Sequence, residues 1–110
     1  MRSIGKNRID RKGREQGYWE DLHINGVIRC KGLYVNGLRE GYWESYYSDG
    51  SLNYKGTYNN GLKDGYWEYY YSCGNLSIKG VYLNNKENGV WEYYCRDGSL
   101  DERILYENGN

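Results

Sequence analysis

Four glutamates recur at one position of the sequence, each directly after a tryptophan: Glu20, Glu44, Glu68 and Glu92. In an antiparallel sheet with two strands per repeat, neighbouring members of this row stand about 10 Å apart. That distance is close to the carboxylate separation of inverting glycosidases. The register argued below also places a lysine or arginine opposite each glutamate, which keeps the carboxylate ionised and paired. We therefore interpret the row as ion pairs and expect a protein with no catalytic residue, not an enzyme.

The other reactive side chains form no recognisable site. His23 is the only histidine, and it stands where later repeats have tyrosine, so we interpret it as a packing substitution. The cysteines Cys30, Cys73 and Cys95 show no CxxC spacing, and Cys30 and Cys95 would lie roughly 24 Å apart in the sheet, too far for a disulfide. We expect reduced thiols, no metal site, no phosphate-binding loop and no cofactor.

The residues around each glutamate define a repeat. Gly-Tyr-Trp-Glu occupies positions 17–20, 41–44 and 65–68, and Gly-Val-Trp-Glu occupies 89–92, a period of 24 residues. Self-similarity at such a period is typical of repeat proteins. The 110 residues include 15 tyrosines, 4 tryptophans and 16 glycines but no phenylalanine or proline. Amphipathic aromatic residues suit a thin structure better than a thick core.

Residues 41–64 indicate how each unit folds. The dipeptide Asp49-Gly50 favours a hairpin with a two-residue type I′ turn. This turn sets five cross-strand pairs: Tyr47 with Leu52, Ser45 with Tyr54, Glu44 with Lys55, Trp43 with Gly56, and Gly41 with Tyr58. We expect the Trp43 ring to lie over Gly56, which has no side chain to obstruct it.

The same register works in the other units. Asn25-Gly26 and Cys73-Gly74 again pair tryptophan with glycine and glutamate with lysine. In the last unit Ile104 replaces the glycine, which predicts a C-terminal cap. Between hairpins, turns are expected at 36–37, 60–61 and 84–85, where asparagine tolerates the left-handed region. The sequence thus predicts an all-β fold, a single-layer antiparallel meander or open solenoid of four 24-residue β-hairpin repeats over residues 17–110.

Residues 1–16 differ in charge from the rest. They carry six basic and two acidic residues, a net charge of +4, whereas residues 17–110 carry nine and thirteen, a net charge of −4. We expect a loose arm or a degenerate capping strand that docks on its own sheet, on a partner or on nucleic acid. No run approaches about twenty apolar residues, and the N-terminus lacks the apolar core of a secretory signal. These features predict no membrane span and a cytoplasmic location in a bacterial or host cell.

The register gathers the tryptophans on one face with many of the tyrosines. An open aromatic face of this width would exceed the few hundred Å² of contiguous apolar surface usual for a soluble monomer. It must curl on itself, be covered by residues 1–16, pair with another copy or bind a partner. We predict the following partner-binding residues on this face: Trp43, Tyr47, Tyr54, Trp67, Tyr69, Tyr71, Trp91 and Tyr93.

Residues 32–41 and 56–65 resemble the MORN repeat, whose core reads Gly-x-Tyr-x-Asn-Gly with a further glycine four residues later. Residues 80–85 match with the second turn residue changed, and residues 104–109 lack the first glycine. Together with Gly-Tyr-Trp-Glu-x-Tyr-Tyr, residues 17–110 are similar to the MORN variant of bacterial proteins grouped as YwqK-family antitoxins. This resemblance implies β-hairpin solenoids that bind or scaffold proteins, a small cytosolic protein that neutralises a partner, and no catalytic residues.

Three function classes remain. The first is a non-catalytic module that sequesters or inhibits a partner protein such as a toxin or an enzyme, of the kind carried by a phage or another mobile element. The second is a carbohydrate-binding or cell-surface module, against which the missing secretion signal counts. The third is single-stranded nucleic-acid binding by aromatic stacking, which is disfavoured because only the N-terminal segment is basic. Self-association through the aromatic face is a further hypothesis.

Overall fold

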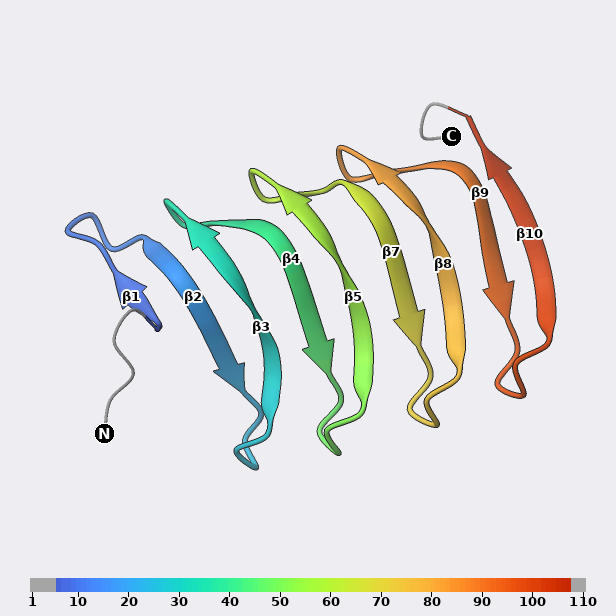
Figure 1. The fold of residues 1–110 in the computed structure, drawn as a ribbon, viewed down its shortest axis with the longest axis horizontal. Coiled ribbons are helices and arrows are strands. Elements are labelled where there is room, and N and C mark those ends of the chain that lie inside the picture. Colours follow the sequence, from blue (N-terminus) through green and yellow to red (C-terminus); the bar gives the residue numbers. More distant parts are fainter. Residues whose placement is uncertain (1–5, 108–110) are drawn as a thin grey trace.

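In the computed structural model, which describes residues 6–107, the chain forms one open antiparallel sheet (Figure 1). The strands are β1 Arg8–Ile9, β2 Glu15–Leu22, β3 Ile28–Val35, β4 Leu38–Tyr46, β5 Leu52–Asn59, β6 Leu62–Lys63, β7 Gly65–Tyr70, β8 Leu76–Leu83, β9 Lys86–Tyr94 and β10 Leu100–Tyr106. They follow one another across the sheet in chain order. The all-β single-layer meander predicted from the repeats is confirmed, and no helix occurs in residues 6–107.

The eight strands expected from residue 17 onward correspond to β2 to β10, with β6 and β7 counted as one strand. This strand is interrupted at Asp64, whose backbone N–H donates to the carbonyl of Thr57 at 3.0 Å. The Thr57 hydroxyl in turn donates to the carbonyl of Asp64. The molecule measures 46 × 33 × 16 Å, and its short dimension corresponds to a single sheet with side chains on both faces.

Most of the predicted hairpin register is confirmed. In the hairpin of β4 and β5, Gly41 lies opposite Tyr58, Trp43 opposite Gly56, Glu44 opposite Lys55 and Ser45 opposite Tyr54. Equivalent residues pair in the other three hairpins. The prediction is wrong beside the turn, where Leu52 lies opposite Tyr46 and not opposite Tyr47.

The reason for this shift is a longer hairpin turn. The N–H of Gly50 donates to the carbonyl of Tyr47, and the N–H of Tyr47 donates to the carbonyl of Ser51. Gly50 has φ 92°, whereas Asp49 keeps the usual negative φ. This is the pattern of a three-residue loop that ends in a glycine bulge, not of a type I′ turn. The Asp49 carboxylate accepts the N–H of Ser51 at 2.9 Å and so stabilises the loop.

The turns between hairpins are as predicted. A type I′ turn needs positive φ at both central residues. All three turns meet this condition: Asn36 and Gly37 have φ of 51° and 81°, Asn60 and Gly61 of 50° and 82°, and Asn84 and Asn85 of 49° and 73°. The strand ends on one side of the sheet are therefore joined by three-residue loops, one within each hairpin. The strand ends on the other side are joined by two-residue turns between hairpins.

A glycine inside β4 decides where the neighbouring tryptophan packs. Gly41 has φ 72°, and the register of β4 against β3 slips beside it. The Trp43 ring consequently lies over Gly32 of the preceding hairpin, where an added Cβ would be 2.2 Å from the ring. Its indole Nε1 donates to the carbonyl oxygen of Leu33 at 3.0 Å.

The relation repeats along the sheet. Trp67 lies over Gly56 and Trp91 lies over Gly80, and both indoles donate to a carbonyl of the preceding hairpin. The expectation that Trp43 covers Gly56 is therefore wrong, although the two residues are paired in the backbone register. Because each ring packs on the hairpin before its own, the tryptophans join consecutive repeats.

The tryptophans and one tyrosine of each repeat form a continuous core. Trp43, Trp67 and Trp91 are 1%, 0% and 2% exposed. Their rings alternate with tyrosines in edge-to-face contacts with centroids 4.8–6.4 Å apart, in the order Trp19, Tyr34, Trp43, Tyr58, Trp67, Tyr82, Trp91 and Tyr106. Such contacts contribute about 0.5–1.5 kcal/mol each beyond the area they bury.

The described part of the basic N-terminal segment docks on its own sheet. β1 pairs with β2, with Arg8 opposite Gln16. The side-chain amide of Asn7 exchanges two hydrogen bonds with the backbone of Glu20, and Lys6 Nζ lies 2.9 Å from the Glu20 carboxylate. Within this segment Arg8–Ile9 form a short edge strand on β2, while residues 1–5 lie outside the described part.

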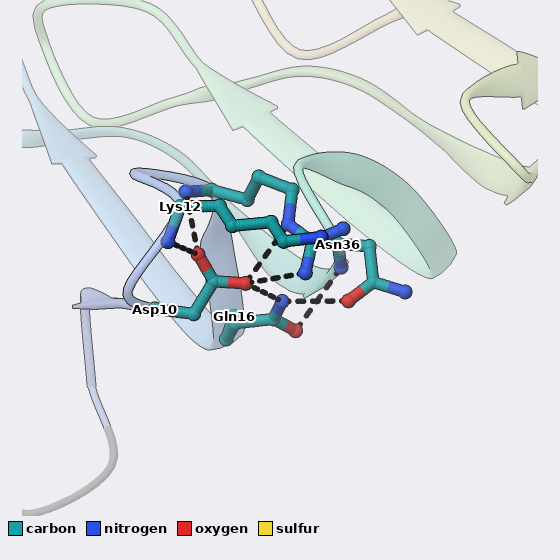
Figure 2. A network of polar contacts seen from close by, with 5 residues as sticks. Asp10, Lys12, Gln16 and Asn36 are labelled. Atoms are coloured by element: carbon teal, nitrogen blue, oxygen red, sulfur yellow. Dashed lines mark hydrogen bonds and ion pairs between the residues drawn. The ribbon is translucent and has the colours of Figure 1, made fainter.

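Asp10 organises the turn between β1 and β2 (Figure 2). Its carboxylate accepts the backbone N–H groups of Lys12 and Arg14, the Arg14 guanidinium and the Gln16 amide. These donors, the Arg14 N–H first among them, hold the pKa of the Asp10 carboxyl well below its usual range. Gln16 also donates to Asn36 at 2.8 Å, so the network ties the capping segment to the turn between β3 and β4.

Candidate protein-binding surface

The face that the sequence predicted as a binding surface is the aromatic core layer. Its three tryptophans, Trp43, Trp67 and Trp91, have almost no exposed surface. The five tyrosines of the predicted set are half-buried: Tyr47, Tyr54, Tyr69, Tyr71 and Tyr93. Four of their hydroxyls bond within the protein, two to backbone carbonyls of the next repeat and two to neighbouring tyrosines.

Cationic side chains cover this layer in the middle repeats. The Arg39 guanidinium lies 4.3 Å from the ring centroid of Trp43, and Lys63 Nζ lies 5.2 Å from that of Trp67. Burial lowers the pKa of the Lys63 amine. The expected open tryptophan face is therefore not found, because the rings pack on the preceding hairpin and are covered from outside.

The opposite face carries a row of eight side chains, of which seven are exposed tyrosine or aliphatic residues and the eighth is the half-buried Thr57. It consists of one residue from each strand from β2 to β5 and from β7 to β10, paired across the hairpins: Tyr18 with Leu33, Tyr42 with Thr57, Tyr66 with Val81, and Val90 with Leu105. We call these eight residues the tyrosine row. Tyr42 and Tyr66 are 52% and 50% exposed, and the strands that carry the row, β2 to β5 and β7 to β10, lie side by side in the sheet of Figure 1.

The glutamates lie beside this row, each held by donors on both sides. Glu44 accepts the hydroxyls of Tyr42 and Tyr46, and Lys31 Nζ lies 3.7 Å from it. These bonds, that of Tyr46 first, lower the pKa of the Glu44 carboxyl. The ammonium near Glu44 thus comes from the preceding hairpin, although Lys55 stands opposite Glu44 in the register as expected.

The same arrangement recurs in the next two repeats. Lys55 lies 3.4 Å from Glu68, and Lys79 lies 3.4 Å from Glu92. Glu92 also pairs with Arg103 at 2.8 Å. A carboxylate is a poor general base when its pKa is lowered and it already accepts hydrogen bonds from phenol hydroxyls. The geometry therefore offers a charge-balanced surface and supplies no argument for acid–base catalysis.

The remaining candidate residues lie apart. His23 Nε2 is 2.7 Å from the carbonyl oxygen of Tyr46, a contact that packs its ring against the next hairpin. The three cysteines are free, Cys30 being buried and Cys73 exposed, and burial raises the pKa of the Cys30 thiol. Within residues 6–107 no group of three or more His, Cys, Asp or Glu side chains is placed to hold a metal ion.

A shallow hollow lies on the same face as the tyrosine row. It has a volume of about 260 Å³ and is lined by Val27, Ile28, Lys31, Tyr46 and Gly50. Val27 and Ile28 stand where later repeats have Ser51-Leu52 and Asn75-Leu76. Val27 and Ile28 therefore form an apolar wall of this hollow, which lies at the first two hairpins near the exposed row.

Sequence reasoning did not single out the tyrosine row as the exposed surface. The signal was present, since Tyr18, Tyr42 and Tyr66 each precede a tryptophan and so point to the opposite face. Which face is exposed depends on where the indole rings pack, and the backbone register alone does not determine that.

Comparison of the chain with models of protein families and with curated protein sequences gives no match. The likeness to MORN repeats thus stays a prediction that depends on the repeat residues themselves. Residues 6–107 contain no helix long and apolar enough to cross a membrane.

The tyrosines beside the glutamates predict a loss of stability at alkaline pH. Burial and then the hydrogen bond to Glu68 raise the pKa of Tyr70 from 10.0 to about 12. Above pH 10 the unfolded chain loses protons that the folded protein keeps. The free energy of unfolding is therefore expected to be unaffected by this group below pH 10 and to fall as the pH rises toward 12. Urea denaturation at a series of alkaline pH values measures this slope.

Glu68→Gln tests the cause of that shift. Removing the charge should lower the pKa of Tyr70, and the difference appears in the ultraviolet phenolate titration of the folded protein. Glu68→Gln in a Tyr66→Phe/Tyr70→Phe background is the matched control, since it removes both tyrosines that donate to Glu68. An identical phenolate titration for the wild type and Glu68→Gln would contradict the assignment.

Proposed function

We propose that this protein is a non-catalytic binding module that sequesters or inhibits a partner protein, and that the partner docks on the tyrosine row. The observation that carries the proposal is the exposed run of tyrosine and aliphatic side chains across the hairpins, on a face whose charges are paired. A contiguous apolar patch of several hundred Å² on a soluble domain is often an interaction site.

The composition of the row supports a protein partner. Tyrosine is enriched at the centres of protein interfaces because it buries a large area with few rotatable bonds. Tyr42 on β4 lies opposite Thr57, and Tyr66 on β7 lies opposite Val81. The hydroxyls of the two tyrosines donate to Glu44 and Glu68 at 2.8 and 2.7 Å, so the rings are held in place before a partner arrives.

The other hypotheses drawn from the sequence relied on stacking by rows of tryptophan and tyrosine. Trp43, Trp67 and Trp91 are buried, so these three rings offer no open face for stacking on sugars or single-stranded nucleic acid. Two of the five described basic residues of the N-terminal segment also pair with acidic groups of the protein, Lys6 with Glu20 and Arg14 with Asp10. An antitoxin-like inhibitor in the cytoplasm, built from MORN-like repeats, remains our proposal.

Affinity capture with matched variants tests the proposal. The tagged wild type, Tyr42→Ala/Tyr66→Ala and Ile24→Ala are each incubated with lysate of the source cells at low and high salt. Ile24 is fully exposed in a hairpin loop away from the row, so it controls for a general loss of apolar surface. We expect one salt-resistant protein to co-purify with the wild type and Ile24→Ala, and at least about tenfold less with the double variant. Equal recovery by all three proteins would contradict docking on the row.

A further inference from the structure

The tyrosine row has a regular step. Its tyrosines stand on β2, β4 and β7, and Val90 takes the fourth place on β9. Between consecutive members lies one further paired strand. Since neighbouring strands are about 4.8 Å apart, the row repeats about every 9.6 Å. A ligand that lies across the strands meets the same side chains at each step.

Among regular peptide conformations, the polyproline II helix matches this step best. It completes one turn in three residues and advances about 9.3 Å, so over three steps the mismatch is about 1 Å. Two turns of α-helix, seven residues, advance about 10.5 Å, a mismatch of about 3 Å over the same distance. In an extended strand, side chains on one face repeat about every 6.7 Å, a spacing that does not match the step of about 9.6 Å in the row.

The chemistry of the row also fits such a segment. Proline rings pack against exposed aromatic side chains, which is how proline-rich segments are commonly bound. A polyproline II backbone leaves its carbonyls without internal hydrogen bonds, and its prolines donate none. It therefore needs donors from the surface. Lys31, Lys55 and Lys79 supply partly exposed ammonium groups at the same 24-residue interval.

The charge of the face favours a neutral ligand. Glu44, Glu68 and Glu92 each accept a phenol hydrogen and contact a cation. A strongly basic or acidic ligand would have to displace these pairs, whereas backbone carbonyls add acceptors to ammonium groups that still have free N–H bonds.

From this match we infer that the tyrosine row binds a proline-rich segment of the partner in the polyproline II conformation. The segment crosses the strands and places every third residue, a proline, against Tyr18, Tyr42 and Tyr66 in turn. About ten residues span the four places of the row. This inference rests on the proposed function and specifies the part of the partner that is bound.

The test uses the full chain and two synthetic peptides. The first consists of Pro-Ser-Ala triplets over about twelve residues, and the second has the same composition with its prolines clustered so that the three-residue period is lost. Chemical shifts of the tyrosine row and fluorescence anisotropy follow the titrations. We expect the periodic peptide to shift resonances of the row, and to bind at least about tenfold more tightly than the clustered peptide.

Two double variants locate the site. Tyr42→Ala/Tyr66→Ala should lose at least about tenfold in affinity for the periodic peptide. Tyr42→Phe/Tyr66→Phe, which keeps the rings, should stay within about twofold of the wild type. Because both tyrosine side chains are half-exposed, the two variants are expected to fold, and their thermal melting controls for this.

The outcomes separate the inference from the proposed function. If neither peptide shifts the row while the captured partner still requires Tyr42 and Tyr66, the polyproline inference is overturned and the proposed function stands. If capture too is independent of the two tyrosines, both fail. A concentration-dependent dimer that disappears in the alanine variant would also overturn the inference, because a second copy would then occupy the row.

Discussion

Trp67→Ala is expected to lower the free energy of unfolding by about 3–5 kcal/mol, the usual cost of removing a buried tryptophan. The Trp67 ring is 0% exposed and lies against four tyrosines, Tyr54, Tyr58, Tyr69 and Tyr82. Its loss also leaves the carbonyl oxygen of Thr57 without the indole donor 3.0 Å away. Denaturant unfolding followed by circular dichroism measures the change.

Trp19 provides the matched control. It occupies the same place in the first repeat, but its Nε1 has no hydrogen-bond partner, and it contacts one aromatic ring of the described set, Tyr34. Within residues 6–107 the Trp19 indole thus lacks the bond and most of the ring contacts that Trp67 makes, so Trp19→Ala should cost clearly less than Trp67→Ala. Equal costs would mean that packing on a preceding hairpin contributes nothing to stability.

The burial of the tryptophan rings changes how the effect of tryptophan variants on partner capture is interpreted. Trp43 and Trp67 were predicted from the sequence to bind the partner, and on that hypothesis Trp43→Ala/Trp67→Ala would weaken partner capture by removing contacts. Since both rings are buried, the structure indicates that any loss of capture would follow from unfolding. Capture by such a variant has to be compared with its folded fraction at the same temperature.

Gly56→Val is expected to destabilise the sheet by about 1–3 kcal/mol or more, as overpacking of a filled core does. An added Cβ at this position would lie 2.1 Å from the Trp67 ring, and the ring is buried and hydrogen-bonded, so it has little room to move. Thermal and denaturant unfolding report the loss. Unchanged melting would contradict the packing described here.

A double-mutant cycle identifies the ring involved. Trp67→Leu in the Gly56→Val background should partly relieve the clash and give a coupling energy, whereas Trp43→Leu should be closer to additive. Ile104→Val is the tolerated control, since Ile104 stands at the glycine position of the last hairpin and already carries a branched side chain there. Stronger coupling of Gly56→Val to Trp43 than to Trp67 would restore the packing first expected from the sequence.

Much of the fold was predictable because the repeats constrain it. Pairs such as Trp43 with Gly56 and Glu44 with Lys55 follow from the hairpin register, and the structure confirms them. Asn60-Gly61 was predictable because few residues adopt positive φ, and these two do so. Ile104 stands opposite Trp91 in the glycine position of the last hairpin, as the register predicted.

The parts of the fold that were not predicted depend on features that the pairing of strands does not determine. Asp49-Gly50 is compatible with a two-residue turn and with a three-residue loop, and the hydrogen bonds select the loop. The positive φ of Gly41 kinks β4 and thereby sets the direction of the Trp43 ring. The alternation of side chains along a regular strand does not reveal such a kink. Because the ring direction decides which face is covered, the predicted binding residues fell on the core side.

Hydroxyl-radical footprinting with mass spectrometry tests the central claim most directly, because it compares adjacent residues on opposite faces. Tryptophan is intrinsically at least as reactive as tyrosine toward this reagent, so protection of a tryptophan reports burial. We predict that Tyr42 and Tyr66, which are half-exposed, are oxidised faster than their neighbours Trp43 and Trp67. Oxidation of Trp43 and Trp67 as fast as that of the tyrosines would contradict the account and return the binding surface to the tryptophan face.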